Sequence, residues 1–358
     1  MSAPHGHVLV ARLDSVGDIL LAGPAVRAVA ASAARVTMLV GRGRAPVARL
    51  LPGVDDVIEF EAPWVVPDPG GVDPAAVDAL VAQVRAARVD AGLVLTSFHQ
   101  SPLPLALLLR MAGVGWLGAI SEDYPGSLLD LRHLMPDAPA DVPESERALA
   151  LARAAGFTFE GPARLEVRHP LPDVSALVGE GPYVVYHPGA DAPARRPSAG
   201  QSRTLVAALV AAGHRVVVTG SPVEADLTGT VAQGQALDLT GAVDLAGLAA
   251  VLEGAQVVVA PNTGPAHLAA AVGTPVVSLF APVVPPERWA PYGVPVVLLG
   301  DQDAPCRLTR ARHCPVPGHP CLDGVDPDAV VAAVATLRLT PPAGTTVPAR
   351  TREVDHVS

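Results

Sequence analysis

Asp18 is the residue of the amino-terminal half that could act as a general base. It follows an apolar run, His7–Leu13, which predicts a strand, and a short turn, at the point where a helix is expected to begin and to run to about Ala31. In open α/β sheets the carboxyl ends of the strands form the edge that binds ligands, so this carboxylate would face a crevice. A cap of the helix is the simpler interpretation of the same aspartate.

The segment Val257–Pro282 has the order of strand, loop and helix that suits a phosphate group. Val257–Ala260 predicts a buried strand, and the helix is expected to begin at Pro265, with Asn262 or Thr263 as its cap. The first N–H groups of a helix are unpaired and lie at the positive end of its dipole, which favours an anion such as a diphosphate. Many such turns bind nothing, so this pattern alone leaves the hypothesis open.

Three further sets of polar residues follow predicted strands. Arg195 and Arg196 lie in a Gly- and Pro-rich loop after Tyr183–Tyr186, and guanidinium groups suit bidentate contacts with phosphate. Solvated loop charges are the alternative. Glu224 lies in the exit loop of the next predicted strand, His214–Thr219. Loop residues after the predicted strand at 91–95 could line the first domain's side of a cleft, although ordinary surface polarity explains them equally well: Ser97, His99 and Gln100.

Length and hydrophobic pattern predict two domains. The chain has 358 residues, half of them hydrophobic, and strands alternate with helices in both halves, which indicates two parallel, doubly wound sheets facing each other across a cleft. We expect a first domain over residues 1–165, a linker at 166–181 where prolines weaken the pattern, a second domain at 182–340 and a disordered tail at 341–358. A dinucleotide fingerprint is absent, because Pro46 stands where the third glycine of G-x-G-x-x-G would be.

Charge and targeting signals narrow the class of protein further. The formal net charge of −10 argues against a nucleic-acid surface, which needs an excess of Lys and Arg. Arg12 and Asp14 interrupt the apolar start too early for a signal peptide, so a cytoplasmic protein is expected. The uncharged stretch around Val257–Pro282 is long enough for a membrane span, but Pro, Asn, Gly and His residues interrupt it. No transmembrane segment is predicted, and peripheral contact with a membrane stays open.

The three cysteines, Cys306, Cys314 and Cys321, lie within one short segment near the carboxyl terminus. An odd number of cysteines in a cytosolic chain argues against a disulfide framework. Together with His319 they offer enough ligands for zinc, but the paired C-x2-C spacing typical of zinc sites is missing. Reduced cysteines in an ordered loop are the favoured interpretation, and a structural zinc site is the alternative.

Four motifs in this order resemble glycosyltransferase family 9, the ADP-heptose:lipopolysaccharide heptosyltransferases: VARLDSVGDILLAGPAVRAV, YHPGADAPARRP, VVVTGSPVE and NTGPAHLAAAVGTPVVSLFAP. The resemblance covers about residues 7–340 and implies a GT-B arrangement of two Rossmann-like domains, with the last helix, Asp326–Leu337, crossing back to the first. It also implies an inverting transfer, without metal or cofactor, of a sugar, usually a heptose, from a nucleotide diphosphate to an acceptor hydroxyl. That acceptor would be a saccharide, a lipid-linked glycan or a small molecule, bound by the first domain while the second binds the donor.

The resemblance also implies roles for single residues. Asp18 would take the proton of the acceptor hydroxyl, and Glu224 would contact the donor ribose. The donor phosphates would be held by Arg195, Arg196, Thr263, Gly264 and His267. An inverting displacement needs a base on one face of the sugar and stabilisation of the departing diphosphate on the other.

Asn262 departs from the family pattern, which has an aspartate at this position. The amide keeps hydrogen-bonding reach toward the donor sugar but loses the negative charge, so the donor could differ from ADP-heptose. Two alternatives to the transferase therefore stay open: a sugar-nucleotide-binding protein without catalysis, and a sugar-nucleotide epimerase or hydrolase on the same fold.

Overall fold

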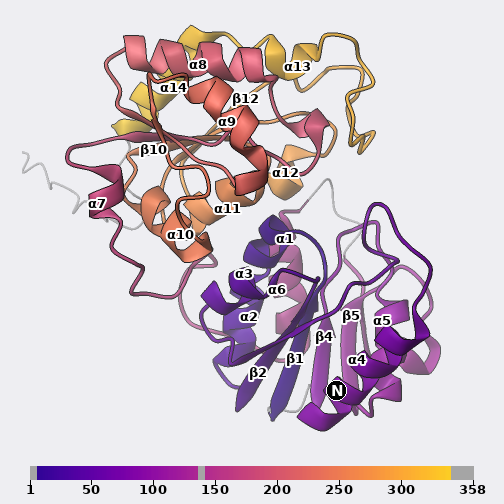
Figure 1. Ribbon diagram of the computed structural model, residues 1–358. Helices are drawn as coiled ribbons and strands as arrows, with labels where there is room; N and C mark the ends of the chain where they lie inside the picture. Colours follow the sequence, from indigo (N-terminus) through magenta and orange to yellow (C-terminus); the bar gives the residue numbers. More distant parts are fainter. Residues whose placement is uncertain (1–5, 136–141, 340–358) are drawn as a thin grey trace, which may run out of the picture.

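The computed structural model describes residues 6–135 and 142–339, which form two α/β domains (Figure 1). The first domain contains a parallel sheet of six strands in the order β3-β2-β1-β4-β5-β6. The strands are β1 (His7–Arg12), β2 (Arg35–Val40), β3 (Asp56–Glu59), β4 (Ala91–Val94), β5 (Trp116–Ile120) and β6 (Leu131–His133).

The second domain repeats this topology with the parallel order β12-β11-β10-β7-β8-β9. Its strands are β7 (Val184–Tyr186), β8 (Val216–Val218), β9 (Leu237–Asp238), β10 (Val257–Pro261), β11 (Val276–Leu279) and β12 (Val296–Leu299). Each sheet has the 3-2-1-4-5-6 order of a Rossmann fold, in which the strand order reverses between the first and fourth strands. The predicted fold class of two doubly wound domains is confirmed, and each domain has one such switch point, β1/β4 and β7/β10.

Helices of the first domain cover both faces of its sheet (Figure 1). They are α1 (Val16–Leu21), α2 (Gly23–Ala30), α3 (Ala45–Leu50), α4 (Pro74–Ala87), α5 (Leu103–Met111) and α6 (Glu144–Ala154). The single helix expected from residue 19 to about 31 is wrong, because the chain forms α1 and then α2. Pro24 lacks the N–H that a continuous helix would need and stands in the first turn of α2, where that donor is not required.

The second domain contains α7 (Ser175–Val178), α8 (Ala199–Ala211), α9 (Ala225–Ala232), α10 (Leu245–Glu253), α11 (Gly264–Ala271), α12 (Pro286–Trp289), α13 (Pro320–Asp323) and α14 (Pro327–Arg338). The expected crossing of the last helix to the first domain is wrong. Residues of α14 pack against α8 and the strands β10, β11 and β12. Its apolar face, with Val330, Val334 and Leu337, is buried in the core of the second domain, which explains why it stays there.

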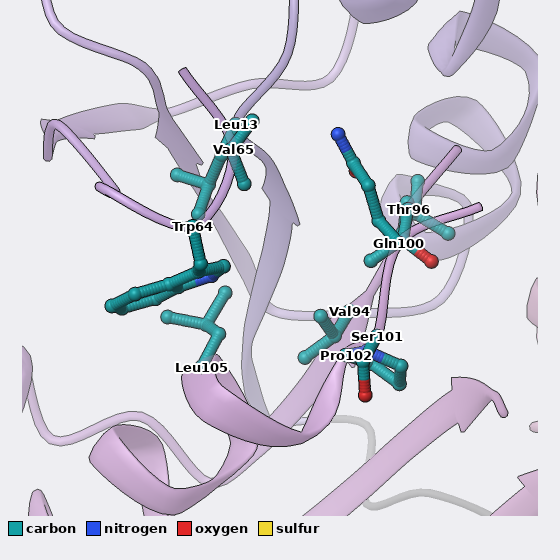
Figure 2. Close-up of a pocket in the computed structure, with 10 residues that line it drawn as sticks. Leu13, Trp64, Val65, Val94, Thr96, Gln100, Ser101, Pro102 and Leu105 are labelled. Atoms are coloured by element: carbon teal, nitrogen blue, oxygen red, sulfur yellow. The ribbon is translucent and has the colours of Figure 1, made fainter. Parts of the chain in front are cut away.

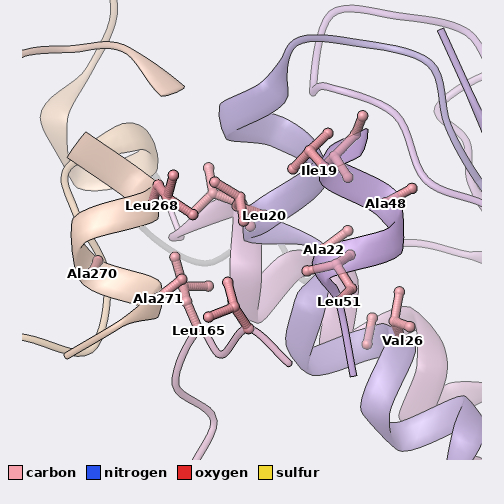
Figure 3. Packing of buried hydrophobic residues seen from close by; sticks show 14 of the residues in the cluster. Ile19, Leu20, Ala22, Val26, Ala48, Leu51, Leu165, Leu268, Ala270 and Ala271 are labelled. Carbon is pink, nitrogen blue, oxygen red and sulfur yellow. The ribbon is translucent and has the colours of Figure 1, made fainter. Parts of the chain in front are cut away.

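The two domains meet through α1 and α11. Leu20 of α1 and Leu268 of α11 are buried in the same apolar cluster, which continues across the boundary (Figure 3). Two glycines allow this close approach. A Cβ atom on Gly17 would lie 2.6 Å from Cδ2 of His267, and one on Gly264 would lie 2.9 Å from Cγ1 of Val16. The beginnings of the two helices are therefore in contact, which places Asp18 beside the predicted phosphate site.

The linker predicted at 166–181 runs along the first domain before it reaches α7. The Arg168 backbone N–H donates to the carbonyl of Leu50 at 2.7 Å, and its side chain donates to the carbonyl of Leu51 at 2.9 Å. The boundaries of the domains stay predictions. The tail predicted at 341–358 lies outside the described residues.

Candidate functional site

Arg12 is the buried centre of the first domain's side of the site. It ends β1 at the switch point, and only 2% of its side chain is exposed. Its guanidinium lies 2.8 Å from Asp14 and 3.4 Å from Glu144 of α6, and it donates to Asp18 at 3.0 Å. Burial alone would lower the pKa of Arg12, but these three carboxylates raise it on balance. Arg12 therefore remains charged and holds Asp18 in place.

Asp18 is the third residue of α1, and its carboxylate belongs to a capping box. Ser15 is the N-cap, and its backbone N–H and hydroxyl donate to Oδ2 of Asp18 at 3.2 and 2.7 Å. The alternative in which Asp18 is itself the N-cap is wrong, because Ser15 is the N-cap and Asp18 is its partner at the third helical position. Burial would raise the pKa of Asp18, but Arg12, Ser15, Trp289 and His267 together lower it. The carboxylate is ionised at neutral pH.

The second domain places three unpaired polar groups near this carboxylate. The atoms Arg195 Nε, Asn262 Nδ2 and His267 Nδ1 are buried and have no hydrogen-bond partner in the described part of the chain. Burial lowers the pKa of His267 to about 4, with Arg195 acting in the same direction and Asp18 in the opposite one. His267 is therefore a neutral donor at physiological pH. Buried polar atoms without partners are costly, and a bound polar ligand would satisfy them.

The first turn of α11 is also free of a side-chain cap. Of the two expected cap residues, Asn262 and Thr263, the structure has Thr263 at the N-cap in an extended conformation, but its side chain makes no hydrogen bond to the helix. Gly264 and Pro265 are the first two helical residues. Pro265 has no N–H, and the Ala266 N–H donates to the carbonyl of Thr263 at 3.1 Å. The Gly264 N–H, which lies after β10 at the switch point of the second sheet, is therefore the donor of this turn that can face an anion.

Glu224 and Arg196 form a separate group on the β7 and β8 side of the second domain. Glu224 accepts from the backbone N–H and hydroxyl of Ser221 at 2.8 and 2.7 Å. Burial would raise its pKa, but Ser221, His187 and Arg196 lower it on balance. A Cβ atom on Gly189 would lie 1.8 Å from Oε1 of Glu224, so the carboxylate sits directly on the loop after β7. The structure places Arg195 nearer Asp18, and Arg196 nearer Glu224.

Two of the three predicted acceptor residues join the Arg12 cluster. The Ser97 hydroxyl accepts from Arg12 at 2.9 Å, and the Gln100 amide donates to Asp14 at 2.5 Å. His99 is exposed and contacts Phe98 edge to face, with ring centroids 5.3 Å apart. Gln100 also lines a mostly apolar pocket at the carboxyl ends of β1 and β4 (Figure 2), together with Leu13, Trp64, Val65, Val94, Leu95, Thr96, Ser101, Pro102 and Leu105.

The short helix α12 closes the site from the second domain. Trp289 Nε1 donates to Oδ1 of Asp18 at 3.2 Å, and its ring lies 5.8 Å from that of Phe98, measured between centroids. The Arg288 guanidinium lies over the Phe98 ring at 4.5 Å and reaches Glu144 at 3.5 Å. An indole, an aromatic ring and an ion pair thus connect the two domains around the Asp18 carboxylate.

The cysteine segment lies apart from this site. Cys306 and Cys321 are buried in the core of the second domain and Cys314 is half-buried, all as free thiols. Burial raises the pKa of Cys321, and the neighbouring Cys306 and Cys314 act in the same direction. Among residues 6–135 and 142–339, no group of three His, Cys, Asp or Glu side chains is arranged to hold a metal ion, so the zinc alternative gains no support.

Comparison with known families agrees with this geometry. The family model described as glycosyltransferase family 9 (heptosyltransferase) matches residues 77–319, which is more than half of the chain. The chain belongs to this family. A glycosyltransferase of family 9 from Veillonella parvula has a similar fold, with a TM-score of 0.76 and 16% identity over 95% of this chain and 99% of that one.

Two heptosyltransferases are also similar to this chain. The ADP-heptose lipopolysaccharide heptosyltransferase II of E. coli has a TM-score of 0.73 and 21% identity, with 93% of this chain and 98% of that one covered. Lipopolysaccharide heptosyltransferase 1 of Pseudomonas aeruginosa is 41% identical over 96 residues. This stretch is 26% of the chain and spans about a quarter of that curated relative, 26% of its length.

Three residues of the candidate site were not predicted from the sequence. Arg12 carries a signal, because a charged residue at the end of an apolar strand must find buried partners. The sequence around Glu144 and Trp289 carries no such signal, because these residues reach the site from a distant helix and from the other domain. No helix within residues 6–135 and 142–339 is long and apolar enough to cross a membrane.

Proposed function

We propose that this chain is an inverting, metal-independent heptosyltransferase with Asp18 as its general base. The donor is a sugar linked to a nucleotide diphosphate, with ADP-heptose as the first candidate, and the acceptor is a saccharide hydroxyl. Family membership supports the reaction class, and the name of the E. coli relative supports the donor. The base itself lies outside the matched range of 77–319, so its role rests on position and chemistry.

The observation that carries the proposal is an ionised carboxylate beside an uncapped helix start. Asp18 and the first turn of α11 come from different domains and meet where Gly17 contacts His267. In an inverting displacement the acceptor oxygen attacks C1 of the sugar, the bond from C1 to the diphosphate oxygen breaks, and the hydroxyl proton passes to the base. The lowered pKa makes Asp18 a weak base at rest. It suffices because the hydroxyl becomes acidic as the new bond forms.

The leaving diphosphate would be stabilised by the second domain. Its negative charge grows in the transition state, where Arg195, His267 and the backbone N–H of Gly264 can donate to it without reorganisation. Arginine and a helix start can supply the stabilisation that a metal ion supplies in other transferases. Glu224, beside the loop that follows β7, is proposed to contact the ribose, and Asn262 the donor sugar. The neutral amide of Asn262 is the residue we expect to set the choice of sugar.

The first test is Asp18→Asn, assayed with ADP-heptose and deacylated lipopolysaccharide in the presence of EDTA. A positioned general base contributes about 10²- to 10⁴-fold, so kcat should fall by that factor while ADP binding changes little. Asp78→Asn, on the exposed side of α4, is the matched control and should keep wild-type activity. Transfer by Asp18→Asn within about threefold of wild type would refute the assignment of the base.

The donor site is tested by calorimetric binding of ADP to Arg195→Ala. Loss of a hydrogen bond to a charged group weakens binding by about 1.5–3 kcal/mol, which is roughly 10- to 150-fold. Binding of ADP that needs a divalent ion would contradict the metal-free mechanism. Binding of a different nucleotide sugar, with ADP-heptose ignored, would keep the transferase and change the donor.

A further inference from the structure

The carboxylate of Asp18 is fully occupied by hydrogen-bond donors. Oδ1 accepts from Arg12 at 3.0 Å and from Trp289 Nε1 at 3.2 Å, and Oδ2 accepts two bonds from Ser15 at 2.7 and 3.2 Å. A carboxylate has about four lone-pair positions. None of them is left for the hydroxyl whose proton the proposed base must take, so one of the present donors has to leave first.

Trp289 is the donor that can leave at least cost. The Ser15 bonds belong to the capping box within α1, and breaking them would expose the first turn of the helix. Arg12 is buried beside three carboxylates and has no solvent to move into. Trp289 ends the four-residue helix α12 in the other domain, is only half-buried, and makes a bond between neutral indole and carboxylate.

We infer that the Trp289 indole N–H holds the place of the acceptor hydroxyl on Asp18, and that the acceptor displaces it when it binds. The inference rests on the proposed role of Asp18 as base. It makes Trp289 a positioning residue, since the oxygen that it contacts, Oδ1, is the one that must receive the proton. The Phe98 ring, 5.8 Å from the indole between centroids and partly exposed, offers the displaced indole an aromatic surface on which to remain.

This contact also protects the donor when no acceptor is present. Water on Oδ1 could attack C1 of the donor sugar. Its oxygen would form the new bond, the bond from C1 to the diphosphate would break with both electrons leaving on ADP, and the proton would pass to Asp18. While the indole N–H is bound there, water has no hydrogen-bonding position on this oxygen. Removing the N–H should therefore turn the transferase into a faster hydrolase.

The pKa of Asp18 gives a readout that does not depend on turnover. Five charged or titratable groups from both domains face it: Arg12, Asp14, His99, Arg195 and His267. All of them are kept in Trp289→Phe, which removes only the N–H donor and preserves a ring against Phe98. The variant should therefore raise the pKa of Asp18 above its wild-type value, since one hydrogen bond to the charged form is lost.

The experiment uses full-length protein labelled with ¹³C at the aspartate carboxyl carbon. The Asp18 signal is assigned by its loss in Asp18→Asn, and its chemical shift is followed as a function of pH in wild type and Trp289→Phe. Trp116→Phe, the same change in the core of the first domain, is the control and should leave the Asp18 pKa unchanged. An unchanged pKa in Trp289→Phe would overturn the inference, because the indole would then not be bound to Asp18 in solution.

Release of ADP from ADP-heptose without acceptor tests the protective role. We expect release to be about tenfold faster in Trp289→Phe than in wild type or Trp116→Phe, which is the lower end of the roughly 10- to 150-fold factor that one hydrogen bond to a charged group represents. The double variant Trp289→Phe with Asp18→Asn should lose this gain. A raised pKa with unchanged release would overturn the protective role. Failure of the proposed function can be distinguished from failure of this inference. In the first case the wild type transfers no sugar to an acceptor, whereas the pKa comparison still shows whether the Trp289 indole is bound to Asp18.

Discussion

The contact between Gly17 and His267 predicts that a single methyl group can disturb the donor site from the opposite domain. In Gly17→Ala the new Cβ would lie 2.6 Å from Cδ2 and 3.2 Å from Nε2 of His267. Carbon atoms in contact prefer about 3.5–4.0 Å, so the ring or the whole domain must move by roughly 1 Å. His267 is 3% exposed and cannot swing into solvent.

The magnitude follows from two opposing effects on stability. Overpacking of a close-packed site costs about 1–3 kcal/mol, while replacing a helical glycine by alanine gains about 0.5–1 kcal/mol. The free energy of unfolding should therefore fall by roughly 0.5–2 kcal/mol. If His267 donates to the diphosphate as proposed, its displacement should lower ADP affinity by about 2- to 10-fold, the value of one neutral hydrogen bond.

The assay combines chemical denaturation with calorimetric ADP binding. Gly229→Ala in α9 is the matched control, because its Cβ would meet no atom within 4 Å, and it should be neutral or stabilising with unchanged ADP affinity. In a double-mutant cycle, Gly17→Ala should cost less in a His267→Ala background, where the clash is absent. The reasoning is refuted if Gly17→Ala behaves like Gly229→Ala, or if its cost is the same with and without the histidine.

Two further predictions concern the carboxylates of Asp14 and Glu224. Burial, with the charges of Asp18 and Glu144, raises the pKa of Asp14 to about 6 in the folded protein, against the attraction of Arg12. Because the pKa of Asp14 is higher in the folded than in the unfolded protein, this group stabilises the fold below the unfolded-state pKa of about 3.9, and the stabilisation is lost as the pH rises through about 6. The contribution of Asp14 to the free energy of unfolding should therefore be about 1 kcal/mol larger at pH 5 than at pH 7. Denaturation of wild type and Asp14→Asn at both pH values checks this, and an equal pH dependence in the two proteins would contradict it. In Gly189→Ala the new methyl group must displace the Glu224 side chain, so ADP should bind more weakly. The control Gly229→Ala should bind ADP as the wild type does. An unchanged calorimetric affinity of Gly189→Ala would show that Glu224 does not contact the nucleotide.

The sequence predicts most of the fold because its strands are short apolar runs separated by Gly and Pro. The strand predicted at Val257–Ala260 is confirmed as β10, Val257–Pro261, since the apolar run stops where Pro261 and Asn262 interrupt it. The long helix after Asp18 fails because apolar periodicity continues through Gly23 and Pro24, and only the proline marks the break. The last helix fails for another reason. Its apolar face is evident, but nothing in the local pattern tells which domain that face will cover.

The site is predictable only in the part that follows strand ends. Asp18, Asn262 and His267 each lie just after a strand, so topology brings them to the same edge of their sheets. Glu144 and Trp289 act through contacts across large sequence separations, which no spacing rule contains. The different surroundings of Arg195 and Arg196 also needed the structure, because Arg195 ends a short 3-10 helix, Pro193–Arg195, and Arg196 follows it in an extended conformation.

In the proposed mechanism the two domains contribute opposite charges to the same reaction, which requires a close contact between them. The first domain would supply the carboxylate of Asp18 and the second would supply donors at α11, so attack and departure on one sugar carbon require both within a few ångströms. Larger side chains at Gly17 and Gly264 would separate the helix starts. The same closeness allows Trp289 to reach Asp18. On this proposal the second domain controls the base of the first, and the pKa of Asp18 should therefore report how the domains are arranged.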